Sequence, residues 1–182
     1  MNKILKRALF ILAILVLAKG MLFRATISYT SVGQREYQMS AYVHGAVMAD
    51  ETTTFRQADI DELIDQAQDL TAARLRFTFD QSDQDPESVW NNERANCIGY
   101  AALFRAILQE QLNDLGLSED YTVEHHVGKL YFLGLNLHSF LDHPFFRDHD
   151  YNVIRDADGT IITAIDVSVY DYIGIARIHH IE

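Results

Sequence analysis

Apolar residues follow a helical period in two stretches of the chain. The first stretch comes after the threonine cap in TTTF, and one of its faces carries Ile60, Leu63, Ile64, Ala67 and Leu70. The second stretch predicts a helix from about Asn96 or Cys97 to about Asn113, with Asn96 as N-cap and Gly116 as stop. One side of this helix is apolar and contains Cys97, Tyr100, Ala101, Phe104, Ile107, Leu108 and Leu112, whereas Arg105, Gln109 and Asn113 share another side.

Runs typical of β-strands fill the second half of the chain. YTVEHHV and KLYFLGL predict two strands interrupted at Gly128, and the β-branched runs HDYNVIR and TIITAIDVSVY predict two more. The DADG sequence between the latter pair favours a hairpin with a two-residue turn at Asp158 and Gly159. A short strand is expected near residues 26–31, and NLHSFLDHPFF is typical of a loop or a short helix. Helices followed by an antiparallel sheet predict an α+β fold.

The N-terminus has the pattern of an export signal. A basic segment with Lys3, Lys6 and Arg7 precedes the apolar run ALFILAILVLA, which has the length of a signal-peptide core. Small residues allow cleavage after Ala18, but the apolar run resumes at residues 21–23, so an uncleaved membrane anchor with a snorkelling Lys19 is the alternative. A buried N-terminal helix is disfavoured because the run has no polar face. We therefore expect residues 1–24 to be a signal or anchor, and residues 25–182 to form one exported domain, periplasmic or extracellular.

Charge and motif content narrow the function classes. The 182-residue chain has a formal net charge of −11, and such a surface repels phosphate backbones, so nucleic acid is not an expected partner. It contains neither GxxxxGK[ST] nor GxGxxG, so no nucleotide cofactor is expected. The histidines show no HExxH or His-x-His spacing, and DADGT lacks the distal glutamate of a calcium loop, so no metal site is expected.

Cys97 is the only cysteine, so it cannot form an internal disulfide. It is either a small buried hydrophobe or a reactive thiol. A helix start favours the thiolate, but by only about 0.3–1 kcal/mol, which is less than the ~1.4 kcal/mol that corresponds to a shift of one pKa unit. A reactive thiol at this position therefore needs a histidine to take its proton and a third group to orient that histidine.

His149 and Asp166 are the expected partners of the thiol. A two-residue turn would pair Tyr151 with Asp166 and would leave His149 and Asp166 as diagonal neighbours on one face of the hairpin, whereas a bulged three-residue turn would shift this register. His143 is the rival base, with Asp156 or Asp158 as its partner, but it precedes a proline instead of opening a strand. Asp150 is the rival acid, but it is adjacent to His149 and points to the opposite face.

The region around the thiol also suggests groups for binding the substrate. Gly99 would allow another backbone or a substrate to approach the helix closely. The backbone N–H of Cys97 could stabilise an oxyanion. A second donor is expected from one of four residues, which are Trp90, Asn91, Asn92 and Asn96.

These motifs together resemble the transglutaminase-like superfamily of cysteine enzymes. The resemblance rests on Cys97-Ile98-Gly99-Tyr100-Ala101, on His149-Asp150-Tyr151-Asn152 and on Asp166-Val167-Ser168, in that order within residues 55–170. It implies a papain-like α+β fold, a Cys97–His149–Asp166 triad and acyl transfer through a thioester. Tyr151 stands where tryptophan is usual in the family, so it is a candidate for setting substrate preference.

The expected function is that of an exported or membrane-anchored enzyme acting on peptide or isopeptide amides. Its expected partner is a peptide or protein substrate, and the N-terminal segment would associate it with the membrane. The alternative is a transglutaminase-like scaffold that binds peptides or a protein partner without catalysis. Fast alkylation of the thiol near neutral pH would distinguish the enzyme from the scaffold.

Overall fold

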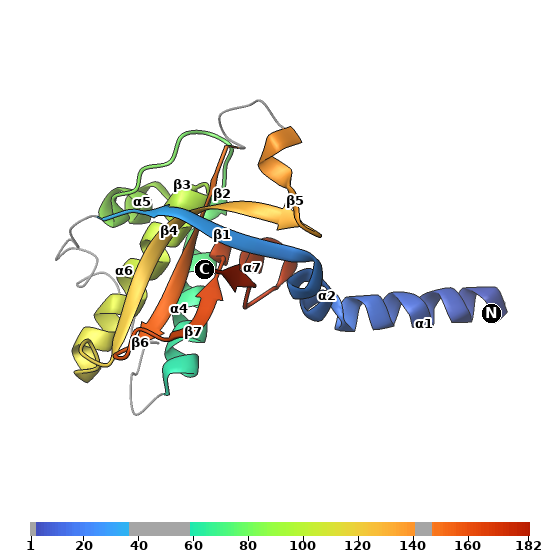
Figure 1. Ribbon diagram of the computed structural model, residues 1–182, viewed down its shortest axis with the longest axis horizontal. Helices are drawn as coiled ribbons and strands as arrows, with labels where there is room; N and C mark the ends of the chain where they lie inside the picture. The colour runs from blue at the N-terminus through green and yellow to red at the C-terminus, as the bar shows by residue number, and fades with distance from the viewer. Residues whose placement is uncertain (1–2, 37–58, 141–146) are drawn as a thin grey trace.

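The computed structural model describes residues 3–36, 59–140 and 147–182 (Figure 1). Two helices, α1 (Lys3–Leu17) and α2 (Lys19–Thr26), lead into strand β1 (Ile27–Gln34). The next described elements are α4 (Ile60–Arg74), β2 (Arg76–Phe77), α5 (Pro86–Asn92), β3 (Arg94–Ala95) and α6 (Cys97–Leu115). They are followed by β4 (Tyr121–Phe132), β5 (Leu135–Asn136), the 3₁₀ helix η1 (Leu137–Phe140), β6 (His149–Asp156), β7 (Ile161–Ile165), α7 (Val167–Ile173) and β8 (His180–Ile181).

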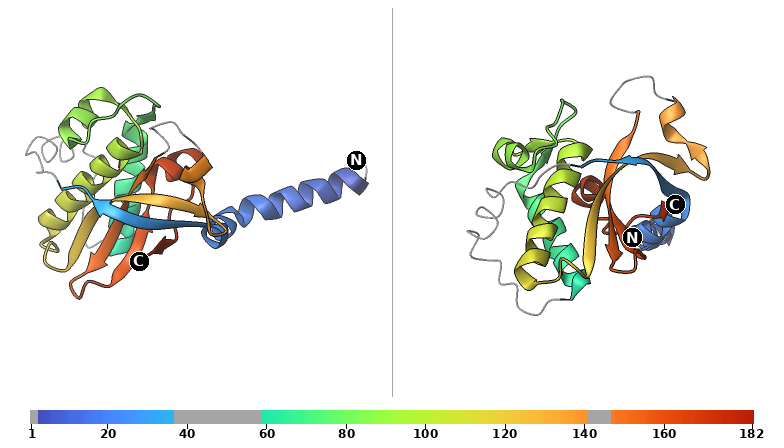
Figure 2. Two further views of the ribbon diagram at one scale, coloured as in Figure 1. Left: turned by 45° about the horizontal axis from the view of Figure 1, so that its top comes forward. Right: turned by 60° about the vertical axis from the view of Figure 1, so that its left-hand side comes forward.

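The larger sheet has the strand order β7-β6-β4-β1-β8, and β5 pairs with β4 beside this path. It is mixed, because β1 and β8 run parallel whereas the other neighbours are antiparallel. The prediction of an antiparallel sheet is therefore wrong at this edge. β1 also enters the sheet before α4, α5 and α6 are reached along the chain, so the expected order of helices before strands does not hold either. The sheet curls into a half-barrel with helices against one side (Figure 2).

Helix α6 lies at the centre of the α+β core. It contacts α4, α5 and α7 as well as strands β4 and β6, and most of its residues are buried. A helix enclosed in this way needs apolar residues on more than one face, which fits the sequence of its first three turns. Both predicted ends are confirmed. The Asn96 side chain accepts a hydrogen bond from the Ile98 N–H at 3.0 Å, and Gly116 ends the helix in the left-handed region with φ of 70°.

The predicted helix near Ile60 is α4, and its Leu63, Ile64 and Ala67 are fully buried in the same core. The expected threonine cap is wrong, because the side chain of Asp59 accepts the hydrogen bond from the Glu62 N–H at 2.9 Å. The threonines themselves lie outside the described residues.

Strand β4 runs unbroken from Tyr121 to Phe132, so the predicted interruption at Gly128 is wrong. A Cβ at this position would lie 2.6 Å from the Tyr151 ring and 2.7 Å from the Thr30 carbonyl oxygen. Gly128 therefore allows a close approach of neighbouring strands instead of breaking the strand. The long strand passes through the middle of the sheet and brings β1 and β6 to its two sides.

The last predicted strand is also shorter than expected. β7 ends at Ile165, and the residues VSVYDYI form helix α7 instead. Asp166 is the N-cap of this helix, and its side chain accepts a hydrogen bond from the Val169 N–H at 3.2 Å. A capping carboxylate thus overrides the β-branched character of the run that follows it.

The N-terminal segment continues into the domain through α2. Lys19 donates a hydrogen bond to the Ile173 carbonyl at 2.5 Å, and Phe23 packs against a second apolar cluster that contains Tyr29 and Tyr151. Within the described residues, no single helix is long and apolar enough to cross a membrane. One pair, Leu5–Leu17 with Lys19–Thr26, has sufficient length and apolar composition when taken together, and it is bent by 61°.

Candidate active site

Cys97 is the first residue of α6, directly after its N-cap Asn96. The capping side chain is itself fixed, because Asn96 also donates to the Asp80 carbonyl at 3.3 Å. The Cys97 residue is only 7% exposed, but it lines a cavity on the surface of the domain. The thiol therefore lies beside the positive end of a long helix and faces a space that a small molecule can enter.

His149 lies against this thiol. It is the first residue of β6, and its Nε2 donates to Asp166 Oδ2 at 2.6 Å. The same imidazole lines the cavity together with Cys97 and interacts electrostatically with it. Because Nε2 serves the carboxylate, Nδ1 is the nitrogen available to the sulfur. Burial alone would lower the pKa of His149, but the charges of Asp166 and Cys97 and the hydrogen bond to Asp166 raise it well above its ordinary value.

Asp166 is the carboxylate that His149 contacts. Its Oδ2 accepts from His149 and, at 2.9 Å, from the Tyr29 hydroxyl. Its Oδ1 accepts from the Ser168 hydroxyl at 2.7 Å and from the Val169 N–H. Burial would raise the pKa of Asp166, but the His149 charge and the hydrogen bonds from its partners hold it below the ordinary value. The carboxylate is therefore a fixed, ionised acceptor.

Tyr29 is the fourth member of this group because its hydroxyl donates to Asp166. It was not predicted as a site residue from the sequence. It is fully buried on β1, and its ring centroid lies 5.9 Å from that of His149 in an edge-on arrangement. Burial and the Asp166 carboxylate raise the pKa of Tyr29 well above its ordinary value, so the hydroxyl stays a proton donor. No local motif marks this tyrosine, because its partner is 137 residues away along the chain.

The register of the β6–β7 hairpin brings His149 and Asp166 together as expected, although the turn differs from the prediction. The Gly159 N–H donates to the Asp156 carbonyl, so Ala157 and Asp158 are the central residues and Gly159 follows with φ of 80°. This turn shifts the pairing by one residue, and an irregularity between Ile154 and Arg155 shifts it back. Asn152 then pairs with Ile165, which is the predicted register.

A cavity of about 630 Å³ lies beside Cys97. Cys97, His149, Ser168 and Asp148 contribute polar groups to its wall, and His138 of η1 adds another ring. The other described residues of the wall are aromatic or aliphatic and come from β2 and the residues after it, from β4, from η1 and from α7.

The cavity wall contains none of the six residues considered for oxyanion or substrate binding. Asn96 caps α6, and Tyr151 is fully buried with its hydroxyl 2.9 Å from His180 Nδ1. A Cβ on Gly99 would lie 2.6 Å from that of Ala95 and 2.5 Å from the Ser82 hydroxyl, so the close approach at this glycine is made by the protein itself. Trp90, Asn91 and Asn92 lie on α5. Their role in substrate binding stays a prediction.

The rival carboxylates Asp150 and Asp156 do not join this group. Asp150 points away from it and binds His125 Nε2 at 2.9 Å and Arg35 Nε at 2.5 Å. Asp156 accepts backbone hydrogen bonds within the β6–β7 turn. His143 lies outside the described residues. Among the residues that are described, no group of three or more histidine, cysteine, aspartate or glutamate side chains could hold a metal ion.

Comparison with known proteins adds no relative. No protein-family model matches the chain, and no curated protein or solved structure does so either.

Proposed function

We propose that the chain is a cysteine enzyme that hydrolyses or transfers amide bonds through a thioester on Cys97. The proposal rests on one observation, the arrangement in which His149 is hydrogen-bonded to the Asp166 carboxylate and shares a cavity wall with Cys97, with which it interacts electrostatically. A helix start alone does not ionise the thiol. His149 can hold the proton of the thiol, and Asp166 stabilises the resulting imidazolium.

In the proposed reaction the Cys97 sulfur attacks the amide carbonyl carbon, and the imidazolium of His149 gives its proton to the departing amine. A thioester and a neutral imidazole remain. The imidazole then removes a proton from water, or from a second amine, as that molecule attacks the thioester. The product leaves, the sulfur regains its electron pair and His149 regains its proton. The backbone N–H of Cys97 is one donor for the oxyanion, because the first N–H groups of a helix have no partner within it.

We also propose that the fold is papain-like and specifically transglutaminase-like. The support is the order of the three residues and their elements. A cysteine opens a buried helix, the histidine opens a strand of the sheet against which that helix packs, and the aspartate follows the neighbouring strand. The resemblance read from the sequence motifs agrees with this arrangement. Export or membrane anchoring through the N-terminal apolar segment remains part of the proposal.

The experiment uses the single cysteine of the full chain. Iodoacetamide labelling at neutral pH, followed by intact mass, should modify the wild type quickly and His149→Ala much more slowly, whereas His143→Ala should behave as the wild type. Cys97→Ala should fold and lose all amidase or transamidase activity, because it removes the nucleophile and little volume. Activity retained in Cys97→Ala would exclude the proposed chemistry.

The alternative function, a peptide-binding scaffold without catalysis, is favoured by the low exposure of Cys97, at 7%. The same labelling experiment separates the two functions. A scaffold thiol would react slowly until the protein is unfolded, and replacing His149 would leave that slow rate unchanged.

A further inference from the structure

The cavity beside Cys97 has a polar part and an apolar part. Among the described residues of its wall, the polar groups belong to the catalytic residues and their close neighbours, apart from His138 on η1, whereas the other side chains are aromatic or aliphatic. Three aromatic rings, those of Phe77, Phe79 and Tyr172, contribute to this wall and pack edge-on around Phe77, with centroids 5.3 Å and 5.6 Å apart. Aliphatic side chains from β4, η1 and α7 form the rest.

Besides Asp148 and His138, the polar groups at the described wall already have partners within the protein and offer little to a peptide backbone. The Ser168 hydroxyl donates to Asp166, His149 donates to Asp166, and the Tyr172 hydroxyl accepts from the Phe77 N–H at 3.2 Å. A peptide carries an N–H and a carbonyl at nearly every residue, and each of them costs free energy when it is buried without a partner. An alkyl chain has no such requirement, so it can fill an apolar cavity without leaving polar groups unpaired.

The size of the cavity supports the same conclusion. Its volume of about 630 Å³ falls within the range of about 300–1,000 Å³ that is typical of pockets enclosing whole small molecules. We propose that this cavity binds the alkyl chain of the acyl group that Cys97 attacks, so that the substrate is a fatty acyl amide. This inference rests on the proposed function and names the substrate class of the same site.

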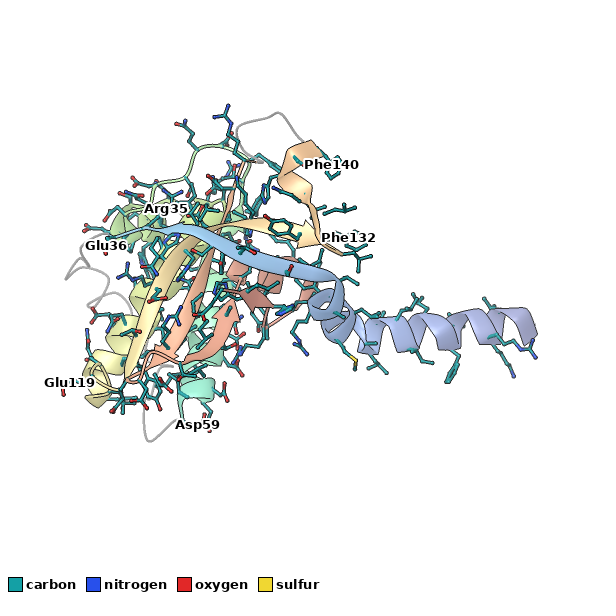
Figure 3. All side chains as sticks on the ribbon, viewed as in Figure 1. Arg35, Glu36, Asp59, Glu119, Phe132 and Phe140 are labelled. Atoms are coloured by element: carbon teal, nitrogen blue, oxygen red, sulfur yellow. The ribbon has the colours of Figure 1, made fainter. Side chains whose placement is uncertain are left out.

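The surface near the cavity is suited to such an amphiphile. The hairpin that joins β4 to β5 carries the exposed side chains of Phe132, Leu133 and Leu135. The Leu133 N–H donates to the Thr26 carbonyl at the end of α2. Figure 3 shows Phe132 on the side of the molecule from which α2 and α1 extend, and Phe140 on the neighbouring η1. The apolar N-terminal helices, this hairpin and η1, which contributes Leu137 to the cavity wall, therefore lie at one end of the molecule.

The reaction of a fatty amide needs no further co-reactant than water. The sulfur forms a bond to the acyl carbon, the carbon–nitrogen bond breaks, and the amine leaves with the proton of His149. Water then splits the thioester and gives a proton to the imidazole, which releases the fatty acid and restores the Cys97 thiolate and the protonated His149. The alkyl chain stays in the cavity through both steps.

The test measures binding to the full-length Cys97→Ala chain in lipid nanodiscs, so that catalysis is not required. Butanamide, hexanamide and octanamide are titrated by calorimetry, with empty nanodiscs as the blank. Each step in this series adds two methylenes, and affinity should rise about fifteenfold per step, which corresponds to about 0.8 kcal/mol for each buried methylene.

Two further variants in the Cys97→Ala background provide a matched comparison. Ile173 lines the cavity and is 47% exposed, whereas Ile181 lies outside it and is 44% exposed. Ile173→Asp should weaken octanamide binding at least tenfold, and Ile181→Asp should leave it unchanged. Affinity that does not depend on chain length, equal effects of the two variants, or equally tight binding of N-acetyl-trileucine amide would overturn the inference. Chain-length-dependent binding without turnover in the wild type would instead refute the proposed function and leave the lipid site standing.

Discussion

Asp166→Asn is the most severe test of the His149–Asp166 hydrogen bond. The substitution keeps the shape of the side chain but changes which hydrogen bonds residue 166 can donate and accept. The asparagine oxygen can still accept from Ser168 and Val169 at the Oδ1 position. Its amide group then faces His149 Nε2, which now has to accept a hydrogen bond instead of donating one. The ring proton moves to Nδ1, the nitrogen on the side of Cys97, and the neutral ring can no longer take the proton of the thiol.

The size of the effect follows from the 2.6 Å contact that is lost. A hydrogen bond to a charged group contributes about 1.5–3 kcal/mol, which corresponds to a decrease of about 10- to 150-fold in the fraction of the reactive ion pair. Iodoacetamide labelling at neutral pH, measured by intact mass, should slow by at least this factor. The unfolded protein should label at the same rate in the variant and in the wild type.

Asp158→Asn is the matched control, because Asp158 is an exposed residue in the turn of the same hairpin. It should label as the wild type does. Near-ultraviolet circular dichroism should show that both variants are folded. If folded Asp166→Asn reacts as fast as Asp158→Asn, Asp166 does not support His149 in the way inferred here.

Two further substitutions test the surroundings of the site. Tyr29→Phe removes one donor to the Asp166 carboxylate from a fully buried position without changing its packing volume much, so urea unfolding should show a loss of about 1.5–3 kcal/mol. Unchanged stability would mean that this hydroxyl is not needed there. Gly99→Ala would place a Cβ 2.6 Å from that of Ala95, so it should destabilise the protein by about 1–3 kcal/mol. A gain of about 1 kcal/mol, which alanine gives inside an open helix, would contradict the crowding seen at this position.

Helix α6 could be predicted from the sequence because its signals are local. Its apolar face repeats within a few residues, and both caps, Asn96 and Gly116, lie at the ends of that repeat. The register of the β6–β7 hairpin agrees with the prediction, but for a different reason. The predicted two-residue turn is wrong, but the irregularity near Arg155 compensates for the turn that forms instead.

The features that the sequence did not reveal depend on contacts between distant residues. The parallel pairing of β1 with β8 joins Tyr29 to His180, near opposite ends of the chain. The unbroken course of β4 depends on Gly128 fitting against Tyr151 and Thr30, which no local pattern records. The turn from strand to helix at Asp166 was missed because valine-rich runs favour strands, whereas the cap and the packing of α7 on α6 decide the outcome here.

The protonation state of His149 is the most direct test of the proposed mechanism, because its pKa is raised well above the ordinary value by Asp166 and Cys97. A group whose pKa is raised on folding keeps its proton to higher pH than in the unfolded chain. Nitrogen-15 NMR of the histidine rings should therefore show both nitrogens of His149 protonated at neutral pH and above. In Cys97→Ala the proton should be lost at lower pH, because one of the two stabilising charges is gone. A neutral His149 ring at neutral pH in the wild type, or the same titration in both proteins, would contradict the proposed ion pair.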